Sequence, residues 1–383
     1  MERNVICPYY GRCGGCQMQE YSYEEQLQRK QKRLQELFGD FGPVEPIVGM
    51  EDPMHYRCKV HAAFGRGRDG KTVSGVYQAE SHRIVAVENC LIEHEAAGKI
   101  VAAVKELLPK FKLQPYDEDR RRGFLRHVLV RVGCFSGEVM VVLVTASRLF
   151  PGKKEFVKEL LRRCPEITTV VQNINDRPTS MVLGKDNETL FGPGRISDSL
   201  CGLNFLISPG AFYQVNPVQT EVLYGTAMEF AGLTGSELVV DAYCGTGTIG
   251  LIAAKNAREV VGVELNRDAV KDAVLNAKRN GIKNARFFAD DAGKFLCRMA
   301  QEGQAADVVF MDPPRSGSSE EFLRALRQVK PEKIVYVSCD PDTLRRDLEI
   351  LTKGGKYTAV RIRGVDMFPY TEHVETVVEL KRG

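Results

Sequence analysis

The sequence predicts an α/β protein of two domains, whose carboxyl-terminal half forms a mostly parallel, doubly wound sheet. The chain has 383 residues, which is too long for one ordinary hydrophobic core. Beyond about residue 205, short buried strands alternate with helical stretches, and we expect these strands at 238–242, 260–264, 307–311 and 334–338. The boundary is therefore expected near residue 205, with one domain over 1–204 and a second over 205–383.

The first half of the chain has a different pattern. Residues 55–90 and 124–145 alternate apolar and polar side chains, which predicts strands of a mixed or antiparallel sheet. Residues 20–38 are rich in Glu, Gln, Lys, Arg and Leu, and predict a helix that ends near Gly39. A short helix is expected over 156–164. The first domain is therefore expected to be α+β.

Composition and charge narrow the classes of protein. No apolar run is long enough to cross a bilayer, and the first residues lack the pattern of a signal peptide, so we expect a cytoplasmic monomer without membrane contact. The net charge of +3 identifies no partner by itself. Residues 101–150 carry nine basic against five acidic side chains, which fits a polyanionic partner.

Three cysteines near the amino terminus have the spacing of a metal site. Cys7, Cys13 and Cys16 follow Cys-x5-Cys-x2-Cys, and two glycines between the last two allow a tight wrap of the backbone. Three thiolates need a fourth ligand for a closed site, and Cys90 is the candidate. The spacing does not choose between zinc and an iron–sulfur cluster. The dispersed cysteines are expected to fill the core, namely Cys58, Cys134, Cys164, Cys201 and Cys297.

A glycine loop follows the predicted strand at 238–242. Residues 245–250 match Gly-x-Gly-x-x-Gly, and Glu264 closes the next strand where a ribose-binding carboxylate belongs. Asp241 would repel a pyrophosphate but attract a sulfonium or ammonium group, and Asp291 is placed to accept from an adenine amino group. These two residues favour S-adenosylmethionine over NAD.

The strand ends further along carry the expected chemistry. Asp312-Pro313-Pro314 is followed by Arg315, where amino-group methyltransferases have an aromatic residue, so methylation of an exocyclic nitrogen is the weaker interpretation. Cys339 ends the strand at 334–338 and supplies the nucleophile that methylation at a pyrimidine carbon requires. Glu375 is expected to be the base that removes the proton from carbon 5.

Together these motifs resemble the RNA (uracil-5-)-methyltransferase family, in the branch that carries a 4Fe-4S cluster. The resemblance is carried by the cysteine spacing, Phe212–Asn216, Asp241–Gly245, Asp312–Arg315, Ser338–Asp347 and His373–Glu375. It implies a Rossmann-like domain that binds S-adenosylmethionine, preceded by an iron–sulfur and RNA-binding domain, with helix 20–38 packed on the catalytic domain. It also implies that Cys339 is the nucleophile and Glu375 the base.

The same resemblance assigns the ligand-binding residues. The cluster would be held by Cys7, Cys13, Cys16 and Cys90. S-adenosylmethionine would contact Gln214, Tyr243, Thr248, Glu264, Asp291 and Asp312. The chain departs from many relatives in two ways: the expected small β-barrel is not found before the cysteine motif, and Cys58 stands where asparagine is common.

For the RNA, we expect phosphate contacts from a basic track and base stacking beside the pocket. The track comprises Arg120, Arg121, Arg122, Arg126, His127 and Arg131, and the stacking residues would be Phe212 and Tyr213. Ribosomal RNA is favoured over transfer RNA. A cytosine-5 RNA methyltransferase and a non-catalytic RNA-binding factor remain the alternatives.

Overall fold

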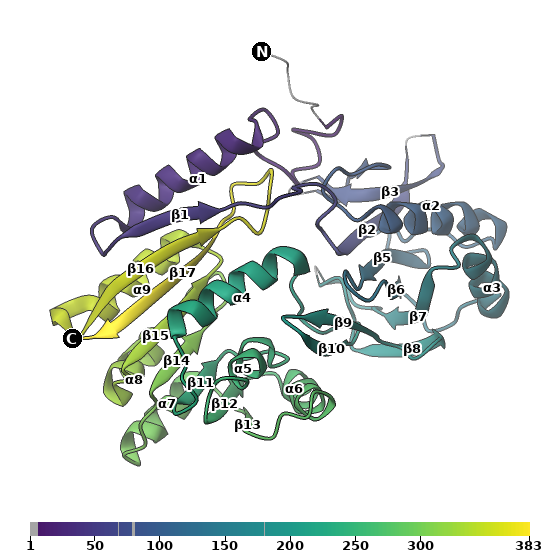
Figure 1. Ribbon diagram of the computed structural model, residues 1–383. Coiled ribbons are helices and arrows are strands. Elements are labelled where there is room, and N and C mark those ends of the chain that lie inside the picture. Colours follow the sequence, from purple (N-terminus) through teal and green to yellow (C-terminus); the bar gives the residue numbers. More distant parts are fainter. Residues whose placement is uncertain (1–6, 68, 79–80, 180) are drawn as a thin grey trace.

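The computed structural model describes residues 7–67, 69–78, 81–179 and 181–383, and it is organised by two β-sheets (Figure 1). One has eight strands and the other seven, and a two-stranded hairpin lies between them. The first six residues of the expected amino-terminal domain lie outside the described residues. The α/β fold class expected from the sequence is confirmed.

The eight-stranded sheet is mostly parallel. Its order is β1 (Val44–Val48), β16 (Tyr357–Val365), β17 (Glu375–Arg382), β15 (Lys333–Ser338), β14 (Val308–Met311), β11 (Leu238–Ala242), β12 (Glu259–Glu264) and β13 (Ala285–Ala289). Only β17 runs antiparallel to its neighbours. The four strands expected from the sequence in this half correspond to β11, β12, β14 and β15.

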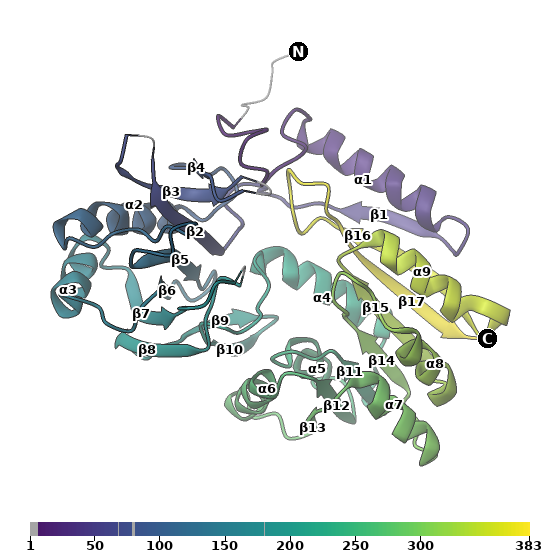
Figure 2. The same cartoon turned by 180° about the vertical axis from the view of Figure 1, so that it is seen from behind.

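Helices cover both faces of this sheet, as in a doubly wound fold (Figures 1 and 2). One face packs against α4 (Pro217–Ala231), α5 (Thr248–Ala253) and α6 (Arg267–Arg279). The other packs against α1 (Tyr23–Phe38), α7 (Ala292–Gln301), α8 (Glu320–Val329) and α9 (Pro341–Thr352), with a short 3-10 turn at Lys353–Gly355. None of the helices in the described part of the chain is long and apolar enough to cross a membrane.

The seven-stranded sheet is mostly antiparallel. Its order is β4 (Ile84–Ala86), β3 (Thr72–Tyr77), β2 (Lys59–Arg66), β5 (Leu125–Val132), β6 (Val139–Thr145), β7 (Ile167–Ile174) and β8 (Asp186–Phe191). Among the strands that the structure describes in this sheet, β6 and β7 form the only parallel pair, and α3 (Lys153–Arg163) connects them. Together with α2 (Glu95–Lys110), α3 buries one face of the sheet.

The other face of the seven-stranded sheet joins the core of the first sheet. Leu129 and Val142 belong to one continuous apolar cluster with Phe205 and Leu223. Phe205 lies in the hairpin of β9 (Ile196–Leu200) and β10 (Leu203–Ile207), which packs between the two sheets (Figure 1). The two sheets are therefore held together by a shared hydrophobic core.

The early part of the chain contributes to the sheet that the later part forms. The early segment comprising α1 and β1 belongs to the eight-stranded sheet, where Val44 of β1 pairs with Ile362 of β16. Residue 205, the expected boundary, falls inside β10. Pro46 lies within β1 and cannot donate to a ladder, which is tolerated because β1 is an edge strand. Nothing in the local pattern of this segment indicated a strand that pairs with residues so much later in the sequence.

Helix α1 is held to the catalytic sheet by a buried ion pair. Lys30 Nζ lies 2.7 Å from Asp366 Oδ1, and the side chains are 3% and 0% exposed. Lys30 also donates to the carbonyl of Phe368 at 3.2 Å. Burial lowers the pKa of Lys30, so the pair contributes little net stability relative to apolar residues, but removing one partner leaves a buried charge unpaired.

We expect Lys30→Met to lower the free energy of unfolding by about 3–5 kcal/mol, because Asp366 would be left buried without a counter-charge. The matched control is Arg33→Met, which breaks the exposed Arg33–Asp342 pair on the same helix and should cost about 0–1 kcal/mol. Urea unfolding followed by circular dichroism measures both. Equal losses for the two variants would show that the buried pair does not hold α1.

Candidate active site

The active-site crevice lies where the strand order of the eight-stranded sheet reverses. Strand β11 lies between β12 and β14, and the chain proceeds from it first to one side and then to the other. Ligands bind at the carboxyl ends of strands at such a point. Asp241 lies near the end of β11 and Asp312 directly follows β14. A pocket of about 650 Å³ opens at this edge.

Every catalytic and S-adenosylmethionine-binding residue singled out from the sequence lines this one pocket. They are Gln214, Tyr243, Thr248, Glu264, Asp291, Asp312, Cys339 and Glu375. Arg57, Tyr224 and Phe368 line it as well and were not predicted. Arg57 precedes β2 and so reaches the pocket from the other sheet, which no local motif indicates.

The glycine loop is shaped by backbone conformations that favour glycine. Gly245 and Gly247 have φ of +53° and +83° between β11 and α5. Asp241 Oδ2 accepts from the backbone N–H of Gly250 at 2.7 Å, and a Cβ at Gly250 would lie 2.8 Å from that oxygen. The second oxygen, Oδ1, has no hydrogen-bond partner among the described residues. Asp241 thus anchors the loop with one oxygen and leaves the other for a ligand.

Two carboxylates shape the far end of the pocket. Glu264 accepts from the backbone N–H groups of Gly245 at 3.1 Å and Asn266 at 2.8 Å. Asp291 is the N-cap of α7 and accepts from the Lys294 N–H at 2.9 Å. Each carboxylate is therefore held by backbone donors at the end of a strand.

The register of β15 and β17 brings Cys339 beside Glu375. Ser338 pairs with Thr376 in this antiparallel ladder, so the next position places Cys339 opposite Glu375. Because β17 is antiparallel, its first residue lies at the same edge as the carboxyl end of β15. Two residues 36 positions apart in the sequence are thereby brought together at the mouth of the pocket.

Burial and like charges dominate the electrostatics of this group. Burial raises the pKa of Asp312 to about 7, and burial together with Asp312 raises the pKa of Glu375 to about 8. Burial, with the Glu375 and Asp312 carboxylates, raises the pKa of Cys339 to about 11. The exposed Arg315 opposes the shifts at Cys339 and Glu375, and its Nη2 lies 3.4 Å from His373 Nε2. The carboxylates of this pocket therefore favour a positively charged ligand.

Comparison with known proteins identifies the family. Residues 22–383 match the model of the tRNA (uracil-5-)-methyltransferase family. The chain belongs to this family. It is 43% identical over 380 residues to an uncharacterized RNA methyltransferase of Halalkalibacterium halodurans, which covers 98% of this chain and 82% of that protein. An uncharacterized RNA methyltransferase of Caldanaerobacter subterraneus subsp. tengcongensis is 43% identical over 384 residues, 99% of this chain and 84% of that protein.

A solved structure extends the likeness to the fold. The Pyrococcus abyssi tRNA (uracil-54, C5)-methyltransferase in complex with S-adenosyl-L-homocysteine superposes with a TM-score of 0.80 and 27% identity. The match covers 97% of this chain and 86% of that chain. The uracil-5-methyltransferase resemblance seen in the sequence is therefore confirmed, and the iron–sulfur branch stays a prediction.

The four predicted cluster cysteines line a second cavity. Its volume is about 440 Å³, and its lining includes Cys7, Cys13, Cys16 and Cys90 together with Arg57. Burial raises the pKa of Cys16 and raises that of Cys90 to about 12. Within the described residues, no three Cys, His, Asp or Glu side chains are close enough to hold one metal ion. The thiols thus surround a common space without converging on a single point.

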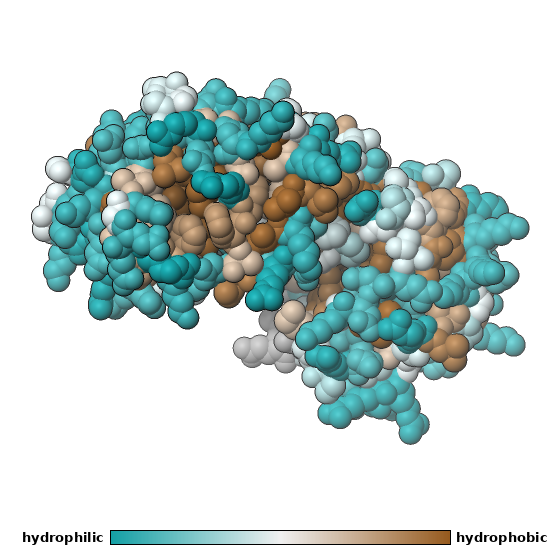
Figure 3. Space-filling model, turned by 90° about the horizontal axis from the view of Figure 1, so that it is seen from below, coloured by the Kyte–Doolittle hydropathy of each residue, from teal (hydrophilic) through white to brown (hydrophobic). Residues whose placement is uncertain are grey.

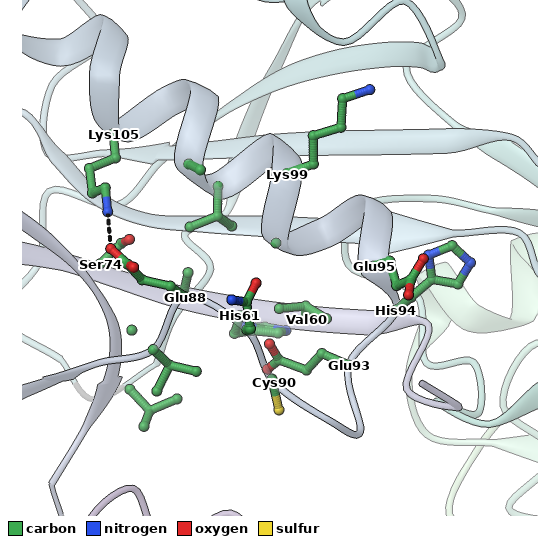
Figure 4. Close-up of a pocket in the computed structure, with 18 of the residues that line it drawn as sticks. Val60, His61, Ser74, Glu88, Cys90, Glu93, His94, Glu95, Lys99 and Lys105 are labelled. Atoms are coloured by element: carbon green, nitrogen blue, oxygen red, sulfur yellow. Dashed lines mark hydrogen bonds and ion pairs between the residues drawn. The ribbon is translucent and has the colours of Figure 1, made fainter. Parts of the chain in front are cut away.

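A third cavity, of about 690 Å³, is larger but differs in character (Figure 4). It lies between α2 and the first strands of the seven-stranded sheet, and the loop of Cys90 and Glu93 separates it from the cysteine cavity. Its lining carries ion pairs, such as that of Lys105 with Glu88 at 3.1 Å. We place the active site in the smaller Cys339 pocket because the nucleophile, the carboxylates and the glycine loop meet only there among the described residues.

The predicted basic track is only partly accessible. Arg120, Arg121 and Arg122 are exposed. Arg126 and Arg131 are each 2% exposed, and His127 is 8% exposed, so these three cannot face RNA as expected. Arg126 instead forms a bidentate pair with Glu118, and Arg131 donates to the carbonyl of Ala211. The alternation of residues in β5 predicted a row of basic side chains that faces solvent. Both faces of β5 are covered, so these side chains are buried.

The two candidate stacking residues also differ. Phe212 is 67% exposed at the rim of the pocket, whereas Tyr213 is buried. The Tyr213 ring lies 6.3 Å from that of Phe205 in the shared core. Phe212 is exposed enough to stack on a base, whereas Tyr213 lines the pocket with a ring that packs mostly into the protein.

In the free protein, we expect the alkylation of Cys339 by iodoacetamide to accelerate as the pH rises toward about 11, because only the thiolate reacts. The increase between about pH 7 and pH 9 should be less than tenfold per pH unit, because Glu375 ionises in this range and its charge opposes the thiolate. Glu375→Gln removes an adjacent carboxylate and should lower the thiol pKa, so that alkylation becomes faster above about pH 8, where Glu375 is ionised. Asp291→Asn, which is not among the charges acting on Cys339, is the control. Mass spectrometry of the labelled peptide gives the rates, and a pH-independent rate would contradict the raised pKa.

Proposed function

We propose that the protein transfers a methyl group from S-adenosylmethionine to carbon 5 of a specific uridine in RNA. The observation that carries the proposal is the placement of Cys339 beside Glu375 in the same pocket as the glycine loop. A thiol nucleophile is not needed to methylate a nitrogen, but carbon 5 of uracil is a poor nucleophile until another group adds to carbon 6. Membership of the family supports the same reaction.

Each catalytic residue then has a defined part. The Cys339 thiolate adds to carbon 6 of the uracil, and the electron pair released toward carbon 5 takes the methyl group from the sulfonium of S-adenosylmethionine, which leaves as S-adenosylhomocysteine. Glu375 removes the proton from carbon 5, and the sulfur leaves carbon 6 as the double bond is restored. The raised pKa of Glu375, about 8, suits a base that must pick up a proton near neutral pH.

The pocket also fits the methyl donor. S-adenosylmethionine supplies an electrophilic methyl group on a positively charged sulfur. Asp241 Oδ1, without a partner among the described residues, and Asp312 suit the cationic part of the molecule. Glu264 suits the ribose hydroxyls, and Asp291 the adenine amino group. Gln214, Tyr243 and Thr248 complete the proposed contacts. A positive ligand would also lower the pKa of Cys339.

Two classes of RNA are candidate substrates. Ribosomal RNA is the substrate expected from the sequence. Transfer RNA is equally compatible, because the description of the family names tRNA and the Pyrococcus abyssi relative is a tRNA methyltransferase. The target base must leave its stack to reach Cys339, and Phe212 at the rim can stack on a neighbouring base. A cytosine target remains the alternative chemistry, and a non-catalytic RNA-binding role remains the alternative class.

We expect RNA in which 5-fluorouridine replaces uridine to become covalently attached to Cys339 when S-adenosylmethionine is present. Fluorine at carbon 5 leaves Glu375 no proton to remove, so the adduct cannot resolve. Denaturing electrophoresis with ribosomal and transfer RNA fragments detects the adduct, and the fragment that reacts identifies the substrate class.

Two variants serve as controls for this trap. Cys339→Ala should abolish the adduct with every fragment. Glu375→Gln should accumulate an adduct even on RNA with ordinary uridine, because proton removal is blocked from the protein side. If no fragment gives an adduct although S-adenosylmethionine binds, the cytosine or non-catalytic alternative gains.

The proposed function includes a 4Fe-4S cluster held by Cys7, Cys13, Cys16 and Cys90. The support is that all four thiols line one cavity. A cluster binds each thiolate to a separate iron, so its ligands surround a body instead of meeting at one atom. Arg57 lines both this cavity and the catalytic pocket. A cluster bound here would therefore lie behind the wall that the cavity and the catalytic pocket share at Arg57.

We expect anaerobically prepared protein to contain about four irons and four acid-labile sulfides per chain. Cys90→Ser should lower the iron content and the visible absorption, whereas Cys164→Ser, a buried cysteine in the core of the seven-stranded sheet, should not. Stoichiometric zinc without iron in the same preparation would contradict the cluster.

Arg120, Arg121 and Arg122 remain the proposed phosphate contacts. Replacing all three with alanine should reduce the slope of log affinity against log salt by about two, since each contact with single-stranded RNA contributes roughly 0.7. The control replaces three exposed cations beside the start of β16 and the end of β17, at the end of these strands that is away from Glu375. These cations are Lys353, Lys356 and Arg382. Filter-binding titrations at several salt concentrations measure both, and an unchanged slope would remove the arginines from the interface.

A further inference from the structure

Two cysteines that were expected to fill the core separately lie in direct contact. Cys58 Sγ donates to Cys134 Sγ at a distance of 3.4 Å. Cys58 directly precedes β2, and Cys134 follows β5, its antiparallel neighbour. The Val132 N–H donates to the Cys58 carbonyl at 2.8 Å, which continues the ladder to the end of both strands. The two sulfurs would have to approach by about 1.4 Å to reach disulfide length.

The two thiols have different surroundings. Cys58 is 3% exposed, whereas Cys134 is half-buried next to Phe135, which is 48% exposed. The hydrogen bond from Cys58 lowers the pKa of Cys134, and donating that bond raises the pKa of Cys58, with burial adding to the rise. Cys134 is therefore the thiol that a small oxidant can reach and that more readily forms a thiolate. The Cys58 thiol stays protonated and lies next to the Cys134 sulfur.

The position of Cys134 is fixed by a buried carboxylate. Asp198 of β9 accepts from the backbone N–H groups of Cys134 at 2.9 Å, Phe135 at 2.9 Å and Ser136 at 3.1 Å. Asp198 is 1% exposed. The turn after β5 is thus held against the β9–β10 hairpin, and the sulfur of Cys134 stays next to that of Cys58.

Cys58 is also connected to the catalytic pocket. Its backbone N–H donates to the carbonyl of Val215 at 2.7 Å. Val215 and its neighbour Gln214 line the Cys339 pocket, as does Arg57 next to Cys58. A change in the position of Cys58 would therefore move residues that line the pocket.

We propose that Cys58 and Cys134 form a redox site, which a hydroperoxide oxidises to a disulfide and a dithiol reduces again. The Cys134 thiolate attacks one peroxide oxygen, the O–O bond breaks, and hydroxide leaves and becomes water, so that Cys134 carries a sulfenic acid. The Cys58 sulfur then attacks the Cys134 sulfur, the S–O bond breaks, and hydroxide leaves with the Cys58 proton as water. Two thiols are oxidised and one peroxide is reduced to two molecules of water or, for an alkyl peroxide, to water and an alcohol.

The test is to treat the full chain with hydrogen peroxide, block free thiols and map the peptides without reduction. We expect the Cys58 peptide joined to the Cys134 peptide as the first disulfide formed, and separated again by dithiothreitol. Cys58→Asn should leave a sulfenic acid on Cys134 that dimedone traps. Cys164→Ser is the control and should form the link as fast as the unchanged protein. Independent alkylation of both thiols after oxidation, or direct conversion of Cys134 to a sulfinic acid, would overturn the proposal.

The effect on the pocket rests on the proposed function and has its own readout. We expect the disulfide form to bind S-adenosylmethionine several-fold more weakly, and dithiothreitol to restore the affinity. Cys134→Ser should show no such loss after peroxide treatment. If the link forms and the affinity is unchanged, the control of the pocket is refuted. The mapped disulfide does not depend on methyl transfer, so a failure of the proposed function is distinguishable from a failure of this one.

Discussion

The apolar core shared by the two sheets is the constraint on which the arrangement of the pocket depends. Leu129 and Val142 of the seven-stranded sheet bury against Phe205 and Leu223, which lead into the other sheet. The segment between them, 208–216, is held at both ends and carries Gln214 and Phe212 to the pocket. Hydrophilic side chains cover most of the outline of both lobes when seen from below (Figure 3). The hydrophobic contact between the sheets restrains the spacing of the pocket walls.

Within the eight-stranded sheet, one antiparallel strand, β17, places the proposed base beside the proposed nucleophile. A wholly parallel sheet would place the amino end of β17 at the opposite edge from the carboxyl end of β15. The reversal of β17 brings Glu375 to Cys339 through main-chain pairing, so the nucleophile and the base are positioned by backbone hydrogen bonds. On its other side Glu375 pairs with Val365. The Lys30–Asp366 pair anchors the segment that follows Val365, which links α1 to the support of the base.

Local patterns were sufficient for the features that depend on neighbouring residues. The glycine loop, the strand before Cys339 and the Asp312-Pro313-Pro314 turn follow from short sequence signals, and the pocket gathers the residues those signals indicated. Features that depend on distant pairing could not be predicted in this way. The pairing of β1 with β16, the burial of Arg126 and Arg131, and the contact of Cys58 with Cys134 each arise from tertiary packing. An exposed arginine and a buried one look the same in a strand of alternating residues, because alternation does not show whether the second face is covered.

Three carboxylates at the catalytic edge of the sheet, Asp241, Asp312 and Glu375, destabilise the folded protein when they ionise. Burial raises the pKa of Asp241 to about 8, of Asp312 to about 7 and of Glu375 to about 8. In the unfolded chain these carboxyl groups have pKa values near 4. Because the folded state raises these pKa values, it binds protons more tightly, and this contribution to stability is lost as the pH rises from about 4 through the pKa values of the folded state. Near neutral pH the folded state therefore carries part of this cost. A cationic ligand between the carboxylates offsets it, so the binding of a sulfonium compound and the stability of this edge of the sheet are coupled through the same charges.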